Sequence, residues 1–395
     1  MIEILKEELL DEPKILVIGG GGGGNNALDR MISSNLKGAH YAAMNTDIQV
    51  LNSCLAERKI QLGKKLTKGF GAGADSDIGE AAAMESEEEI KELIKEYDLC
   101  IVTCGLGGGT GTGAAPIIAK CCKELGILTV AVVTTPFSFE NTPRITAANH
   151  GLDKLKENVD TLLTIPNDKL IGLSEKPLLL EDAFMIADSV LKYTIEGITN
   201  IIYNKGMVNL DFNDLRTTLA GKGIGHLGIG IVESGNSILE AVKLAINSPL
   251  LDTSIQGASN LLINTCGKVN IVDLNEAISH VRELAGDHVN IIWGTVSSKD
   301  FNEDKIVVTL IATGMDTAIS SRKTPQSGSP SLSAKAPDLE LGELKSKHRN
   351  SSNTYPPKGI VIPSFLLEAQ KKRLLLNIKG LCANLIFKFL HTVPV

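Results

Sequence analysis

Two glycine-rich stretches place the strongest constraint on how this 395-residue chain folds. The first, Gly19–Gly24, is six consecutive glycines between the apolar run "KILVI" and the helix-like "NNALDRM". The second, "GLGGGTGTGAAP" at residues 105–116, stands in the same way between "LCIVTCG" and "APIIAKCCKEL". Glycine lets the backbone approach a ligand closely, and the amides that open a helix attract anions. Both stretches are therefore predicted to bind phosphate groups at strand ends.

Strand-like and helix-like stretches alternate from Lys14 to Asn167, which predicts a parallel α/β sheet covered by helices on both faces. The expected strands are "KILVIG", "AHYAAMNTD", "CIVTCG", "ILTVAVVTT" and "TLLTIPN", and "EAAAMESEEEIKELIKEY" is helical. Apolar residues at helical spacing over 181–203 predict a long, largely buried helix. The runs "SNLLINTCG", "NIIWGTVS" and "KIVVTLIATG", with helices near 237–247 and 274–285, indicate a second, smaller α/β domain.

Composition excludes several classes of function. The formal net charge of −7 offers no basic surface for a nucleic-acid backbone, so we expect no nucleic-acid partner. The seven cysteines show no C-x-x-C pair and several lie in apolar runs, which is typical of reduced, buried thiols rather than disulfide or metal sites. The acidic start "MIEILKEELLDEPK" lacks the pattern of a signal peptide, so a cytoplasmic protein is expected.

The first glycine stretch also contains G-x-G-x-x-G, the pattern of a dinucleotide-binding turn. In that alternative, an NAD-dependent dehydrogenase, Asp47 would hold a ribose. The second stretch weakens it, because two loops plus the hydroxyls of Thr110 and Thr112 supply more donors than a pyrophosphate needs and suit a triphosphate. A third loop, "GFGAGA" at 69–74, is placed to cap the terminal phosphate, and no Walker-type G-x-x-x-x-G-K-[ST] is present.

The motif "GGGTGTG" resembles that of the FtsZ family, the tubulin-like GTPases of bacterial cell division. The resemblance covers residues 13–316 in the family's order, through "GGGGNN", "NTDIQVL", "TKGFGAGA", "TTPFSFE", "TIPNDKL", "DAFMIADSVL", "NLDFNDLRT", "NSPLLD" and "NIIWGT". It implies a tubulin/FtsZ-like α/β fold with a parallel-sheet GTPase domain. The expected divisions are an N-terminal tail (1–12), a GTP-binding domain (13–180), a central helix (181–204), a C-terminal domain (205–316), a disordered linker (317–358), a partner-binding peptide (359–373) and an atypical apolar extension (374–395).

Carried over position by position, the resemblance implies a GTP site. Thr110, Gly111 and Thr112 would hold phosphates, and Ala72, Gly73 and Ala74 match the loop that senses the terminal phosphate. Glu140 matches a ribose contact, Arg144 a nearby nucleotide contact, and Phe184 would stack on guanine. The full expected set is Gly22, Gly23, Gly24, Asn25, Asn26, Asn45, Ala72, Gly73, Ala74, Gly108, Gly109, Thr110, Gly111, Thr112, Gly113, Glu140, Arg144, Asn167, Phe184 and Asp188.

Asp188, with Asn45, is expected to hydrogen-bond the edge of guanine. A buried carboxylate suits guanine's N1–H and exocyclic amine, because adenine offers no such pair of donors. The alternatives are that Phe184 only packs in the core and that Asp188 is a solvated surface carboxylate.

The acidic loop "NLDFND" after the long helix contributes Asn209, Asp211 and Asp214. Its structural alternative is a helix cap, with Asp211 or Asn213 as the N-cap residue. The resemblance implies instead that subunits stack head to tail and that this loop completes the GTP site of the next subunit. Asp211 and Asp214 would then polarise the attacking water, Asn209 would help to place it, and Mg²⁺ would offset phosphate charge; no side chain is predicted as a metal ligand.

Some positions depart from the family pattern. Gly20 stands where the family has valine, Asn25 where it has a small residue, and Asn213 where it has alanine between the acidic residues. Asp75 and Ser76 replace an Asn-Pro pair after the third loop. No residue needed for chemistry is lost, so turnover is put in doubt more than binding.

The C-terminal segment "IVIPSFLLEAQ" resembles the peptide with which FtsZ binds membrane tethers and regulators. Its apolar anchors would be Ile362, Pro363, Phe365 and Leu366. The last residues, 374–395, are apolar with interspersed lysines, and too short and interrupted for a membrane span. A weak membrane contact, an accidental extension and a partner-binding helix are the alternatives for them.

The sequence therefore predicts a GTPase that assembles into filaments and, by resemblance, forms the division ring at mid-cell beneath the inner membrane. Two alternatives share its fold: a scaffold that polymerises but hydrolyses poorly, and a tubulin-like filament for DNA segregation. The dehydrogenase is the third alternative, and it leaves the second glycine loop and "NLDFND" unexplained.

Overall fold

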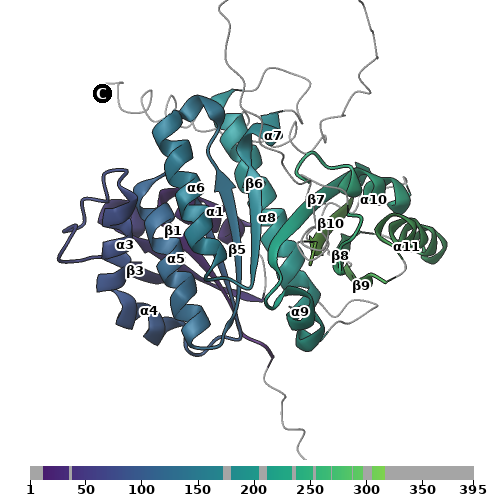
Figure 1. Cartoon of the computed structure of the whole chain (residues 1–395), viewed down its shortest axis with the longest axis horizontal. Coiled ribbons are helices and arrows are strands. Elements are labelled where there is room, and N and C mark those ends of the chain that lie inside the picture. The colour runs from purple at the N-terminus through teal and green to yellow at the C-terminus, as the bar shows by residue number, and fades with distance from the viewer. Residues whose placement is uncertain are drawn as a thin grey trace, which may run out of the picture.

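A computed structural model describes residues 12–34, 38–171, 179–203, 211–233, 237–251, 255–267, 269–286, 288–296 and 305–315. These residues form a ten-stranded sheet in the order β3-β2-β1-β4-β5-β6-β7-β10-β8-β9. Helices cover both faces of the sheet (Figure 1). Asn209 and the expected linker, C-terminal peptide and apolar extension lie outside the described residues, as do residues 1–11 of the expected N-terminal tail.

The first half of the sheet is parallel throughout, as predicted. Its strands are β1 (Ile15–Gly20), β2 (Ala39–Asn45), β3 (Arg58–Gln61), β4 (Leu99–Gly105), β5 (Leu128–Thr135) and β6 (Thr161–Pro166). Its helices are α1 (Gly21–Ser33), α2 (Ile48–Ser53), α3 (Ser76–Glu85), α4 (Glu87–Ile94), α5 (Gly109–Glu124), the short 3-10 helix η1 (Ser138–Glu140), α6 (Thr142–Lys156) and α7 (Asn167–Ile171). Every residue of β1 is buried, because helices cover the sheet on both sides.

The predicted long helix is α8 (Leu180–Tyr203), which packs on the sheet beside α1. Ile195 and Ile198 are fully buried in the core cluster that α8 shares with both halves of the molecule. At its end, the Tyr203 hydroxyl donates a hydrogen bond of 2.5 Å to the carbonyl of Pro13, just before β1. The end of α8 is thereby fixed at the edge where the parallel strands begin.

The second half contains β7 (Gly223–Glu233), β8 (Asn260–Cys266), β9 (Asn290–Val296) and β10 (Lys305–Thr313), with α9 (Phe212–Leu219), α10 (Ile238–Ile246) and α11 (Ile271–Ala285). The sequence did not predict β7, which joins the two halves. It pairs with β6 in parallel over three residue pairs, Thr161 to Leu163, and with β10 in antiparallel fashion over the eight pairs from Lys305 to Ala312.

The glycines of β7 explain why it was missed, since glycine is depleted in strands and weakens their signal. They have a packing role here: a Cβ at Gly228 or Gly230 would collide with the backbone of α10. The short strand β3 was also missed, and the predicted helix over residues 80–97 is in fact two helices. Ser86 separates α3 from α4, and its hydroxyl accepts a hydrogen bond of 3.0 Å from the amide of Gly63.

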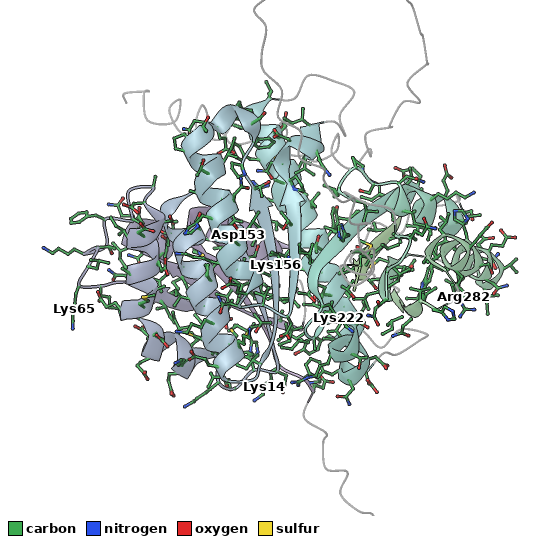
Figure 2. All side chains as sticks on the ribbon, in the orientation of Figure 1. Lys14, Lys65, Asp153, Lys156, Lys222 and Arg282 are labelled. Atoms are coloured by element: carbon green, nitrogen blue, oxygen red, sulfur yellow. The ribbon has the colours of Figure 1, made fainter. Side chains whose placement is uncertain are left out.

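The amino ends and the carboxyl ends of the parallel strands face opposite ends of the molecule. Lys14 and Lys222, which precede β1 and β7, lie toward the end from which α9 projects, whereas α7 lies at the other end (Figures 1 and 2). The carboxyl ends of β1, β4, β5 and β6 therefore meet at the α7 end, where a ligand site is expected in an open α/β sheet.

Candidate functional site

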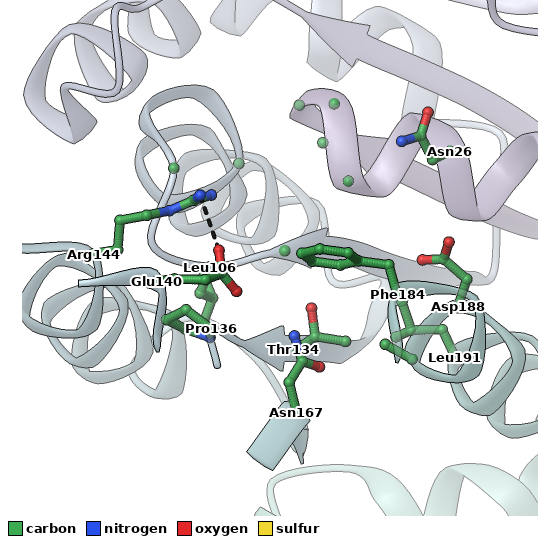
Figure 3. Close-up of a pocket in the computed structure, with 18 of the residues that line it drawn as sticks. Asn26, Leu106, Thr134, Pro136, Glu140, Arg144, Asn167, Phe184, Asp188 and Leu191 are labelled. Atoms are coloured by element: carbon green, nitrogen blue, oxygen red, sulfur yellow. Dashed lines mark ion pairs between the residues drawn. The ribbon is translucent and has the colours of Figure 1, made fainter. Parts of the chain in front are cut away.

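A pocket of about 630 Å³ opens at the carboxyl ends of the parallel strands (Figure 3). Its walls come from α1, the start of α5, the segments after β4 and β5, and the first half of α8. The sequence-predicted residues that line it are Gly22, Gly23, Asn26, Gly108, Gly109, Thr110, Gly111, Glu140, Arg144, Asn167, Phe184 and Asp188. The fold thus brings these segments, which are far apart in the sequence, together around one pocket.

One end of the pocket is built to hold an anion. Both α1 and α5 begin there, and the N-cap residues Gly20 and Gly108 provide no side-chain hydrogen bond to the free amides of the first turn. Neither first turn carries an acidic residue. Two helix N-termini with free N–H groups and positive dipole ends suit a phosphate chain.

The glycines of the two loops are needed for their close approach. Gly21 has φ +68°, and a Cβ there would lie 2.7 Å from the amide nitrogen of Gly111. Gly107 has φ +93°, and its amide donates to the buried Thr112 hydroxyl at 2.9 Å. Thr112, predicted to hold phosphate, therefore supports the second loop from behind and does not line the pocket.

The other end of the pocket presents an aromatic ring and a carboxylate. Phe184 is 39% exposed, and its ring contacts that of Phe137 edge to face, with centroids 5.3 Å apart. Asp188, one helical turn further along α8, forms an ion pair of 3.0 Å with Arg30 of α1. Burial raises the pKa of Asp188 to about 6, and the Arg30 charge opposes this shift. Phe184 is partly exposed at the pocket, and the side chain of Asp188 is largely buried. The alternatives that Phe184 only packs in the core and that Asp188 is a solvated surface carboxylate are therefore wrong.

Polar groups line the wall opposite α1. Arg144 forms an ion pair of 2.9 Å with Glu140, whose other carboxylate oxygen accepts from the amide of Phe137 (Figure 3). The side-chain oxygen of Asn167 is buried and has no hydrogen-bond partner among the described residues. A buried acceptor without a partner is costly, and a ligand hydroxyl in the pocket would satisfy it.

Asn25 and Asn45 lie behind the pocket wall and bond to each other. The side-chain amide of Asn45 donates to the Asn25 side-chain oxygen at 2.8 Å, and that of Asn25 donates to the Gly19 carbonyl at 2.9 Å. The Asn45 oxygen accepts from the amide of Asp47 at 3.1 Å. These groups fix the first glycine loop to the end of β2, and their predicted direct contact with the nucleotide stays a prediction.

The remaining predicted residues also lie outside the pocket lining. Gly24 lets α1 lie on β4, because a Cβ there would lie 2.5 Å from the Thr103 carbonyl. Gly113 lets α5 lie still closer to α3, because a Cβ there would collide with the Ser76 carbonyl. Ala72 is buried against Gly109, while Gly73 and the left-handed Ala74 follow it on the surface. The third loop therefore touches the start of α5, where a terminal phosphate would end.

The acidic loop lies at the other end of the molecule. Asp211 is the N-cap of α9 and accepts a hydrogen bond of 2.8 Å from the amide of Asp214, so the predicted cap is confirmed. Both carboxylates are exposed. The last turn of α9 contacts the amino end of β6, where the Leu219 carbonyl accepts a hydrogen bond from the hydroxyl of Thr161, the first residue of that strand.

Comparison with known proteins agrees with this architecture. Residues 14–175 match the Tubulin/FtsZ family GTPase domain, and residues 223–316 match the FtsZ family C-terminal domain. An FtsZ dimer of M. jannaschii is 42% identical, with a TM-score of 0.74, over 78% of this chain and 89% of that chain. The chain belongs to the FtsZ family. The family resemblance and the tubulin/FtsZ fold are thereby confirmed, and the dehydrogenase alternative is wrong: Asp47, to which it gave the ribose, caps α2.

Two CetZ structures of lower sequence identity share the fold. The GDP-bound CetZ1 monomer of Haloferax volcanii is 21% identical with a TM-score of 0.66, over 78% of this chain and all of that one (100%). The CetZ2 protofilament with bound GTPγS, from the same organism, is 19% identical with a TM-score of 0.65, over 78% of this chain and 98% of that one.

Several pocket residues were not predicted from the sequence. Arg30 follows Asn26 by four residues, so helical spacing on α1 was an available signal. Thr134 is the penultimate residue of β5 and Pro136 directly follows the strand, where the rule for ligands at strand ends would have found them. Within the described residues, no helix has the length and apolarity needed to cross a membrane, and no cluster of three or more His, Cys, Asp or Glu residues is suited to a metal ion.

Proposed function

We propose that this protein binds GTP in the pocket and hydrolyses it to GDP and phosphate at sites shared between subunits stacked head to tail. The observation that carries the proposal is the separation of the two halves of the site. Helix α8 has 24 residues, which corresponds to about 36 Å, with the pocket along its first half and α9 beyond its far end. One chain cannot bring Asp211 and Asp214 to its own pocket, but a second copy stacked on the pocket can.

Guanine recognition is assigned to α8. The ionised carboxylate of Asp188 accepts from N1–H and the exocyclic amine, while adenine offers no matching pair of donors. Phe184 provides a flat apolar face for the base. Glu140 and the side-chain oxygen of Asn167, which has no partner in the described part of the chain, are placed to accept from the ribose hydroxyls.

Hydrolysis is assigned to the exposed carboxylates of the neighbouring subunit. Asp211 and Asp214 orient and polarise the water that attacks the terminal phosphorus, and Asn209 helps to place it. The free amides of α1 and α5 stabilise the phosphate charge in the transition state. Mg²⁺ bound to the phosphates would supply further charge neutralisation.

Exposed apolar side chains around the pocket support a stacked neighbour. Phe139, Leu179 and Leu180 are 57%, 71% and 58% exposed, and Leu180 and Phe139 directly adjoin the lining residues Glu181 and Glu140. Apolar surface of this kind marks an interaction site in a soluble protein. A contact between two different faces does not close on itself, so its repetition builds a filament.

We further propose that the filament forms a division ring in the cytoplasm at mid-cell. Membrane tethers and regulators would be bound through Ile362, Pro363, Phe365 and Leu366, with weak membrane contact by residues 374–395. The similarity to the M. jannaschii FtsZ supports this role. Because the CetZ proteins share the fold, a filament with another role, including DNA segregation, is the alternative. A fluorescent fusion that forms no ring at the division site would favour the alternative.

The shared site is tested by complementation between two inactive variants. Asp211→Ala keeps the pocket and Asp188→Ala keeps the acidic loop, so each alone should hydrolyse little GTP. An equimolar mixture should recover activity at about a quarter of the junctions, those with an intact pocket facing an intact loop. Asp153→Ala, which removes an exposed carboxylate of α6, is the matched control.

Two results would contradict the shared site. One is a turnover per subunit that does not depend on protein concentration and survives both Asp211→Ala and Asp214→Ala. The other is a mixture no more active than its components although both variants co-sediment in one polymer.

A further inference from the structure

The segment Asn45–Asp47, at the end of β2, contacts all three glycine-rich loops without lining the pocket. Asn45 reaches the first loop through Asn25, as described above. Thr46 is fully buried and reaches the other two loops, one with its hydroxyl and one with its carbonyl. The proposed function gives this residue no role.

The hydroxyl of Thr46 lies 2.6 Å from the hydroxyl of Thr110. Thr110 lines the phosphate end of the pocket in the first turn of α5. In a pair of hydroxyls one donates the proton and the other accepts it. Either threonine can be the donor as long as no third group bonds to the pair. When Thr110 donates its proton to a phosphate oxygen, only Thr46 can donate within the pair. The phosphate therefore fixes the direction of the hydrogen bond between the two hydroxyls.

The backbone of Thr46 holds loop 63–75, a longer segment that contains the third glycine-rich loop, residues 69–74. Its carbonyl accepts from the amide of Gly71 and from the hydroxyl of Thr67, both at 3.3 Å. Two residues on, the amide of Ile48 donates to the Gly69 carbonyl at 3.1 Å. A rotation of the Thr46 backbone would therefore disturb several bonds of this loop at once.

Loop 63–75 carries large apolar side chains on the surface of the molecule. Phe70 is 87% exposed and Leu66 is 50% exposed. Phe70 is two residues before Ala72, which contacts the first residue of α5. The loop therefore presents an apolar face whose position depends on the hydrogen bonds of Thr46.

We infer that Thr46 is a positioning residue that couples a phosphate bound at Thr110 to the conformation of loop 63–75 and so to its apolar face. The inference rests on the proposed GTP binding and names the element that makes the surface respond to the nucleotide. With the terminal phosphate present, the hydroxyl pair is fixed and the loop is held. Without it, the pair is free to reverse and the loop is less constrained.

The test is Thr46→Val, which removes the hydroxyl, keeps the shape and leaves the carbonyl in place. The probes are GDP and GTPγS, and the readouts are hydrogen exchange of amides 63–75 and the threshold concentration for assembly. In the wild type, GTPγS should protect these amides more than GDP does. In Thr46→Val this difference should vanish, the threshold should rise roughly five- to tenfold, as expected for one lost hydrogen bond, and GDP affinity should stay within about twofold.

Thr46→Ser restores the hydroxyl and should restore both the protection difference and the threshold. If Thr46→Val does not fold, Thr46→Ala carries the same prediction. Retention of the wild-type protection difference and threshold in a folded variant without the hydroxyl would overturn the inference while leaving the proposed function intact. A wild-type protein that binds neither nucleotide would instead refute the proposed function itself.

Discussion

Replacing Asp188 by asparagine should stabilise the protein in the absence of nucleotide while weakening its binding of guanine nucleotides. The side chain is only 17% exposed, and burial raises its pKa from 3.8 to about 6 despite the opposing charge of Arg30. The charged form required for guanine recognition is therefore disfavoured in the folded protein. Asparagine keeps the shape of the side chain and removes the charge.

The size of the effect follows from the pKa shift of Asp188. A shift of about two units corresponds to about 3 kcal/mol of folding free energy at neutral pH. Because the pKa is raised in the folded protein, ionised Asp188 destabilises the fold. This destabilisation is absent below the unfolded pKa of 3.8, grows between about pH 4 and pH 6, and is constant above pH 6. Loss of charge-assisted hydrogen bonds should weaken GDP binding roughly tenfold or more.

Urea unfolding of the nucleotide-free protein at pH 7.5 and at pH 4 measures this effect. Asp188→Asn should gain up to about 3 kcal/mol over the wild type at pH 7.5 and less than about 1 kcal/mol at pH 4. Asp153→Asn, at an exposed carboxylate, is the control and should show no such gain. The reasoning is refuted if Asp188→Asn is no more stable than the wild type at pH 7.5, or if its gain is the same at both pH values.

Two further predictions concern the first glycine loop. Gly24→Ala should lower the free energy of unfolding by about 1–3 kcal/mol, because the added Cβ would lie 2.5 Å from the Thr103 carbonyl, whereas Gly22→Ala, with nothing within 4 Å, should leave stability unchanged and affect only nucleotide binding. Thermal unfolding distinguishes them, and equal melting temperatures would contradict the packing argument. Asn45→Asp should cost about 1–3 kcal/mol, because the buried donor to Asn25 becomes an acceptor; an unchanged melting temperature would show that this bond contributes nothing.

The sequence predicted the parts of the fold that depend on continuous apolar runs. Strands β1, β4 and β5 are buried along almost their whole length and read as unbroken hydrophobic stretches. Strand β7 was missed because its glycines are required by the close approach of α10. That contact is with a separate helix and cannot be predicted from the residues of the strand itself. The break at Ser86 was missed for a similar reason, since its partner Gly63 is distant in the sequence.

The sequence predicted the residues that line the pocket more completely than those that support its walls. Phe184 and Asp188 both line the pocket, and both come from one family motif on α8. Asn25 and Asn45 belong to the same motifs, yet they lie behind the wall, because a motif records which residues occur together and not which atoms point into the pocket. Arg30 lay outside the quoted motifs and was found only from the geometry.

Strand β7 pairs over fewer residues with β6 than with β10, and this difference determines where partial unfolding of the sheet should begin. Only three residue pairs join β7 to β6, whereas eight join it to β10. The second half of the sheet can therefore separate from the first with β7 still attached, since that breaks fewer ladder bonds than leaving β7 behind. Partial unfolding should follow this seam, so that β7, although next in the sheet to β6, exchanges its amide hydrogens as a member of the C-terminal half.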